Sequence, residues 1–160
     1  MIVIVLMGIV LAIASASWFG VVESRAVDAA TNQLASDLRL AHTRATNQLV
    51  DWAVVSDPAS AGAGAVAPAG NDYYLVRIRP TIAAEDVIGR DLGEDNRAQI
   101  ATSTPIALRF KPDGSVRATD DTVLSAPVTI TVHAEGGTAT DPNSHDVQIV
   151  PATSRVQVDP

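Results

Sequence analysis

The first 22 residues form an unbroken apolar segment, because no charged side chain lies between Met1 and Val22. A helix rises about 1.5 Å per residue, so this segment is about 33 Å long and matches a bilayer core of about 30 Å. Trp18 and Phe19 lie near its end, where aromatic side chains meet the membrane interface. The pattern predicts a transmembrane helix over residues 1–22.

The helical pattern continues beyond this segment, since neither proline nor glycine occurs between Glu23 and Pro58. Apolar residues now recur at steps of three and four, which is the spacing of one helical face. The face predicted to pack on the rest of the protein consists of Val27, Ala30, Leu34, Leu38, Ala41, Ala45 and Leu49. The opposite, polar face carries Asp28, Asn32, Asp37, Arg39 and Arg44. Residues 23–50 are therefore an amphipathic continuation, and the whole rod has about 49 residues and is roughly 70 Å long.

From residue 51 onward the period changes to two, which is typical of β-strands. Strands are expected at 52–55, at 73–79, at 106–110, from 116, at 128–132, at 147–149 and at 156–158. The strand at 73–79 alternates, so burial on one face is expected. Residues 81–104 are acidic and have no clear period, and we interpret them as a solvent-exposed excursion with a helical turn.

These elements predict an α+β protein, with a long N-terminal helix packed on a small antiparallel β-sheet head at residues 51–160. Three or more strands that pack on a helix suffice for a stable unit. The tight turn at Pro112, Asp113 and Gly114 supports a hairpin, because proline presets φ and glycine accepts a positive φ.

Composition narrows the function classes. The formal charge of −7 argues against a nucleic-acid surface, which would be basic. The chain has no cysteine, so disulfides and thiol chemistry are excluded.

Candidate chemistry is sparse. The histidines His42, His133 and His145 include no pair at the i, i+4 spacing of a helical zinc site, so surface or strand-edge histidines are expected, with His145 in a loop. Asp141, Asn143 and Asp146 offer oxygen ligands for calcium but lack the pattern of an EF-hand loop, which favours a plain turn and leaves another kind of calcium site open. We expect no catalytic residue, no metal and no cofactor.

Four stretches carry a resemblance to a known family. Residues 1–9, MIVIVLMGI, resemble the apolar run of type IV pilins and pseudopilins. Residues 34–41, LASDLRLA, look like the corresponding part of GspH/FimT-type minor pseudopilins. Residues 110–115, FKPDGS, are similar to a hairpin of that group. Residues 147–158, VQIVPATSRVQV, resemble its last hairpin, in which a glycine is usual at the position of Ser154.

The resemblance implies a minor subunit of a type II secretion pseudopilus or a type IV pilus. Its implied partners are other pilin or pseudopilin subunits, the inner-membrane assembly platform, membrane lipid and, if the true start lies upstream of Met1, a prepilin peptidase, with no nucleic acid. The implied location is the cytoplasmic membrane, crossed once, with the head outside the cytoplasm. The helix face that enters the membrane and the filament would comprise Met1, Val5, Gly8, Leu11 and Ile13.

The family's cleavage site and the glutamate after it would lie upstream of Met1. We expect that the start was assigned too late, or that this is a defective copy. Other interpretations also stay open. Ala14, Ser15 and Ala16 could be a signal-peptide cleavage site, although no basic region precedes the apolar run. The segment could also be a plain anchor, and the alternative function is a membrane-anchored or secreted β-rich binding module that acts without polymerisation.

Overall fold

The computed structural model describes residues 2–62, 70–92, 97–101, 105–151 and 153–159. One helix, α1 (Ile2–Gln48), covers 47 residues and precedes every strand. Along its N-terminal part, the structure describes the side chains of Met7 and of the residues from Val22 onward. The predicted continuous rod is thus present, and it ends one residue before the predicted stripe does.

Two antiparallel sheets form the head. The first has the order β3-β2-β1-β5-β6, with β1 (Trp52–Val55), β2 (Tyr73–Arg77), β3 (Val87–Arg90), β5 (Ala107–Phe110) and β6 (Val116–Ala118). The second has the order β4-β7-β8-β9, with β4 (Ala98–Ile100), β7 (Val128–Ala134), β8 (His145–Val150) and β9 (Arg155–Asp159). Short 3-10 turns occupy Pro58–Ala61 and Ala84–Asp86. The chain is therefore an α+β protein, as predicted, but its head contains two sheets where one was expected.

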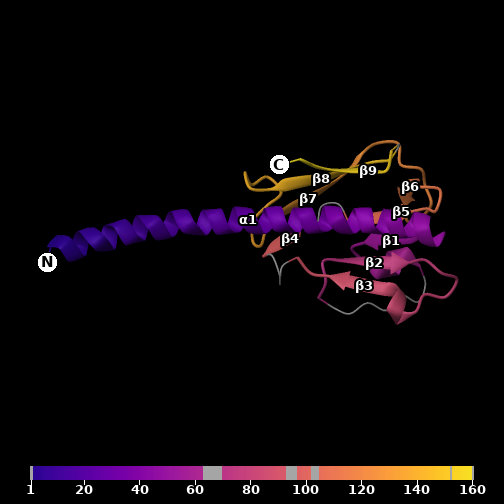
Figure 1. Cartoon of the computed structure of the whole chain (residues 1–160), viewed down its shortest axis with the longest axis horizontal. Coiled ribbons are helices and arrows are strands. Elements are labelled where there is room, and N and C mark those ends of the chain that lie inside the picture. Colours follow the sequence, from indigo (N-terminus) through magenta and orange to yellow (C-terminus); the bar gives the residue numbers. More distant parts are fainter. Residues whose placement is uncertain (1, 63–69, 93–96, 102–104, 152, 160) are drawn as a thin grey trace.

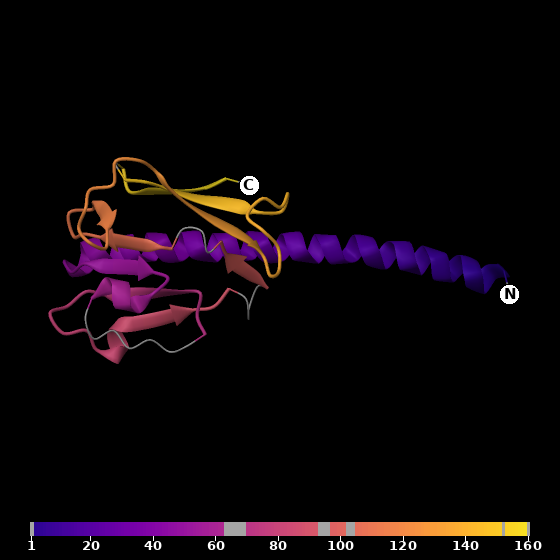
Figure 2. The same ribbon diagram turned by 180° about the vertical axis from the view of Figure 1, so that it is seen from behind.

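The C-terminal half of α1 packs against both sheets. One core cluster combines helix residues with side chains from the first sheet, such as Trp52 and Phe110, and from the second, such as Val132 and Ile149. Figures 1 and 2 show the two sheets lying along this half of the helix, while the N-terminal half extends away from the head. The helix thus connects two sheets that share no strand pairing among the described residues.

Strand β2 is buried on both faces, so the expectation of one buried face is wrong. Tyr73 and Leu75 join the main core against α1. Tyr74 and Val76 point to the other side, because successive side chains of a strand alternate. There a second cluster covers them, which consists of Ala53, Val55, Tyr74, Val76, Ile82 and Val87. Ile82, which follows β2, is part of this cluster, and Ala61 of the turn before β2 packs against it.

The segment 81–104 contains strands that the sequence pattern did not predict. The predicted helical turn is present at Ala84–Asp86, and β3 and β4 follow it. Asp86 is buried, and its carboxylate accepts a hydrogen bond from the backbone N of Ala83 at 3.1 Å and contacts Arg79 at 3.5 Å. The expectation of a solvated excursion is therefore wrong for these parts, while the acidic residues 94 and 95 lie outside the described residues.

Candidate functional site

The predicted stripe of α1 is the surface on which the head is built. Six of its seven residues have no solvent exposure: Val27, Ala30, Leu34, Leu38, Ala41 and Ala45. The buried face is wider than the stripe, because Ala35 and Thr31 are also buried. The buried hydroxyl of Thr31 donates a hydrogen bond to the carbonyl oxygen of Val27 at 2.7 Å.

Leu49 does not belong to this surface, so the prediction is wrong at that residue. The helix ends at Gln48, and Leu49 takes a left-handed conformation with φ of 54°. Its side chain is 75% exposed. Because the backbone changes direction after Gln48, the side chain of Leu49 no longer lies on the buried face of the helix, although the sequence spacing of three and four continues.

Asp37 is the polar centre of the interface between α1 and the first sheet. The sequence pattern placed it on the polar face, yet it is only 6% exposed. Its Oδ2 accepts hydrogen bonds from the Tyr73 hydroxyl at 2.8 Å and from Nε of Arg90 at 3.0 Å. The pKa of Tyr73 is raised well above its ordinary value, mainly because the hydroxyl is buried and secondly because the Asp37 carboxylate lies beside it. The carboxylate is satisfied within the protein, so it is an anchor of the fold.

Polar contacts also join α1 to the second sheet. Arg39 donates to the carbonyl oxygen of Val156 at 3.1 Å, which occupies a backbone acceptor on β9, an edge strand. Nε2 of His145 lies 3.3 Å from Oδ1 of Asp28. His145 begins β8, which corrects its predicted place in a loop. These two contacts tie the helix to β9 and β8 of the second sheet.

The other two histidines have structural surroundings. His133 is only 8% exposed, so the prediction that it lies on the surface or at a strand edge is wrong. Its Nδ1 lies 2.9 Å from the carbonyl oxygen of Ala134. The ring of His42 packs edge-on against Phe110, with 6.1 Å between the ring centroids.

The oxygen ligands considered for calcium are engaged in local contacts. Asp141 accepts hydrogen bonds from the backbone N of Thr138 at 2.6 Å and from its hydroxyl at 3.2 Å. Asp146 accepts one from the hydroxyl of Thr131 at 2.7 Å. In the part of the chain that the structure describes, no three histidine or acidic side chains converge in the manner of a metal site.

The apolar segment of residues 1–22 falls largely outside the described side chains. This includes the predicted assembly residues Met1, Val5, Gly8, Leu11 and Ile13. Met7, whose side chain the structure does describe, is 66% exposed. Among the described residues, no helical segment has both the length and the apolar character needed to cross a membrane.

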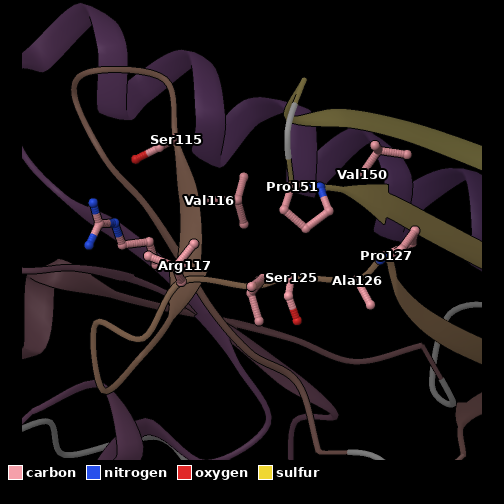
Figure 3. Close-up of a pocket in the computed structure, with 10 residues that line it drawn as sticks. Ser115, Val116, Arg117, Ser125, Ala126, Pro127, Val150 and Pro151 are labelled. Atoms are coloured by element: carbon pink, nitrogen blue, oxygen red, sulfur yellow. The ribbon is translucent and has the colours of Figure 1, made fainter.

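A hollow of about 370 Å³ opens on the head between the two sheets. Its lining consists of Ser115, Val116, Arg117, Val123, Leu124, Ser125, Ala126, Pro127, Val150 and Pro151. In Figure 3 the guanidinium of Arg117 extends away from Val150 and Pro151, so the hollow is bounded mainly by apolar groups and backbone. Its described lining contains no carboxylate, histidine or tyrosine that could transfer a proton.

Comparison with known proteins adds no support to the pilin resemblance, which rests on the four sequence stretches named above. No family model, curated protein or solved structure matches this chain. The relationship to pilins therefore stays a prediction, while the helix, the two sheets and their contacts are structural facts.

Sequence reasoning missed the partners of Asp37. Tyr73 and Arg90 come from strands 36 and 53 residues away along the chain, so no local period relates them to the helix. The local pattern gave no signal for them, because a buried carboxylate requires partners that only the folded chain brings close. The sequence pattern assigned Asp37 to the polar face opposite the stripe, and therefore to solvent.

Proposed function

We propose that this chain is a minor pilin-like or pseudopilin-like subunit of a type II secretion pseudopilus or a type IV pilus. In this proposal, residues 1–22 cross the cytoplasmic membrane before assembly, and the head lies outside the cytoplasm. The subunit then enters the filament through its apolar helix. Its partners are other pilin or pseudopilin subunits, the inner-membrane assembly platform, a prepilin peptidase and membrane lipid.

The observation that supports this function is the division of α1 into two halves. Its C-terminal half is fully packed against two sheets, with six stripe residues from Val27 to Ala45 at zero exposure. Its N-terminal half extends beyond the head as part of the same helix (Figures 1 and 2). A helix that is apolar on all sides requires lipid or other helices around it. Such a segment can exchange lipid for neighbouring subunits while the head stays folded.

Cysteine crosslinking in cells tests the proposal directly. The chain has no cysteine, so Leu6→Cys and Ile13→Cys each introduce a single thiol. We expect disulfides between these positions and single cysteines placed in the apolar helix of major pilin subunits. Asn47→Cys is the matched control, because it lies on the same helix, exposed, beside the head. It should remain uncrosslinked under the same oxidation.

Crosslinks at positions 6 and 13, with none at 47, would establish that the N-terminal half of the helix contacts filament subunits. A chain that stays monomeric in the membrane, with a folded head, would overturn the proposal. That outcome would favour a membrane-anchored β-rich binding module, for which the hollow beside Val116 and Pro151 is the first surface to probe.

A further inference from the structure

Two arginines meet at a buried tryptophan near the C-terminal end of α1. The guanidinium carbon of Arg44 lies 4.9 Å from the ring centroid of Trp52, which is a cation–π contact. Arg77 on β2 is the cross-strand partner of Trp52 on β1. We propose that Arg44, Arg77 and Trp52 form a binding site for a carboxylate side chain that another polypeptide presents.

The two arginines approach the tryptophan from the same side of the sheet. Tyr73 and Leu75 point toward α1, since both belong to the core cluster that contains the helix residues. Side chains two positions apart share a face of a strand, so Arg77 also lies on the helix side. Arg44 and Arg77 are both partly exposed, so part of each side chain can meet a partner.

Neither arginine is neutralised within the described part of the chain. The other basic groups near the first sheet have acidic partners: Arg79 with Asp86, Arg90 with Asp37, Arg109 with Asp51, and both Lys111 and Arg117 with Asp121. Asp51 immediately precedes Trp52, but Arg109 holds its Oδ2 through Nε at 2.8 Å and a terminal nitrogen at 2.6 Å. Among the described residues, no ion pair reaches Arg44 or Arg77, so two positive charges remain uncompensated at this position.

Two hydrogen-bond donors in the same cluster also lack an acceptor. Nε1 of Trp52 and Nε of Arg77 are buried and have no hydrogen-bond partner among the described residues. Trp52 itself is only 5% exposed. Buried donors are nearly always paired, and each exception requires an explanation. A carboxylate at the exposed parts of Arg44 and Arg77 matches the planar fork of a guanidinium, and its negative charge also offsets the partial positive charge of the two buried donors.

The charge balance favours a polypeptide as the source of that carboxylate. The chain has 18 acidic and 11 basic residues, so a second copy or a subunit of similar composition presents many acidic side chains. Leu49 lies five residues after Arg44 and three before Trp52, and its side chain is 75% exposed. This exposed apolar side chain is close in the chain to Arg44 and Trp52, and a peptide can contact it whereas a free inorganic anion cannot.

An NMR titration of the full chain in detergent micelles tests this site. The chain has two tryptophans, Trp18 and Trp52, so labelling tryptophan with ¹⁵N yields two indole N–H signals. The probe is an octaglutamate peptide, and sodium phosphate is titrated in parallel. We expect the peptide to shift the Trp52 indole signal saturably and to leave Trp18, the internal reference, in place. Added salt should weaken the effect, because the site is partly exposed.

Single substitutions decide whether the arginines carry the binding. We expect Arg44→Gln and Arg77→Gln each to weaken binding of the peptide by at least about tenfold. Arg155→Gln is the matched control, since it removes the same charge from an exposed position on β9 and should bind as the original chain does. If Arg77→Gln fails to fold, Arg44→Gln still gives the answer, because it lies on the surface of the helix.

Three outcomes would overturn the proposal. These are a Trp52 signal that the peptide does not shift, a shift that both arginine substitutions leave unchanged, and binding of phosphate without binding of the peptide. The titration measures a site on the head, and the crosslinking above measures contacts of residues 6 and 13. Failure of one therefore leaves the other proposal standing.

Discussion

The hydroxyl of Tyr73 donates a 2.8 Å hydrogen bond to the carboxylate of Asp37, and both residues are buried. This contact joins β2 to the C-terminal half of α1. The same carboxylate oxygen accepts Nε of Arg90 on β3 at 3.0 Å. Apolar contacts alone are non-directional, so these directed bonds fix the rotation of the helix against the first sheet.

The free energy of unfolding should fall less when Tyr73 loses its hydroxyl than when Asp37 loses its carboxylate. Tyr73→Phe leaves Asp37 paired with Arg90, so we expect a loss of about 1–2 kcal/mol in the free energy of unfolding. Asp37→Ala leaves two donors without an acceptor and should cost about 3 kcal/mol or more. Denaturant unfolding of the full chain in micelles, followed by tryptophan fluorescence, measures both. Ser36→Ala, at an exposed position beside Asp37, is the control and should change stability by less than about 0.5 kcal/mol.

Tyr73 should also make the stability depend on alkaline pH. Burial and the Asp37 carboxylate raise its pKa above the ordinary value near 10. The folded state therefore holds the proton more tightly than the unfolded state. This contribution to stability is fully present below about pH 10 and is lost as the pH rises above it, where the unfolded tyrosine ionises.

The original chain and Tyr73→Phe should consequently converge in stability above about pH 10. Tyr74 is present in both proteins, so its ionisation cancels in the comparison. Unfolding curves recorded between pH 8 and 11 measure the difference, and a constant difference over this range would contradict the assignment.

Leu38 should be among the least tolerant positions of the helix. It is fully buried in the core that both sheets share. Leu38→Asp inserts an unpaired charge there and should cost roughly 4 kcal/mol or more. Ser36→Asp introduces the same charge two residues away at an exposed position and should be nearly neutral. A thermal melt that barely moves for Leu38→Asp would show that the helix is not docked on the sheets.

Leu49→Gly should stabilise the protein. Leu49 has φ of 54° after the last helical residue, a conformation that costs a leucine about 1 kcal/mol and glycine almost nothing. The greater freedom of glycine in the unfolded chain offsets part of this, so we expect a net gain of about 0.5 kcal/mol. Denaturant unfolding measures it, and a loss of stability would show that the exposed side chain has a packing role.

Ser154→Gly provides the comparison, because Ser154 also has a positive φ, of 51°. Its hydroxyl donates to the carbonyl oxygen of Gly114, which links the turn between β8 and β9 to the turn between β5 and β6. Loss of this bond should cancel the relief of strain. We therefore expect Ser154→Gly to be neutral or destabilising, in contrast to Leu49→Gly.

Local patterns were sufficient for the elements formed by neighbouring residues. The steps of three and four between Val27 and Ala45 predicted the buried face of α1, since helical periodicity depends only on the chain itself. The turn at Pro112 and Gly114 predicted the hairpin of β5 and β6, which pairs Phe110 with Val116. Register in such a hairpin follows from the turn.

Patterns failed where pairing is distant. Strand β3 contains Gly89 and β4 has three residues, so neither shows a strand period of its own. Each is held by backbone pairing with a longer strand: β3 pairs with β2, and β4 pairs with β7. The burial of Asp37 also depends on distant segments, because its partners Tyr73 and Arg90 lie on β2 and β3.

The sequence by itself therefore determined the long helix, the position of its apolar stripe and the α+β class, all of which follow from side-chain periodicity along one segment. Only the tertiary structure decided that the head has two sheets, that β2 is buried on both faces, and that Asp37 and Trp52 gather arginines around them. These features arise between segments far apart in the chain, where the free energy of burial and of hydrogen bonding selects partners that no local period encodes.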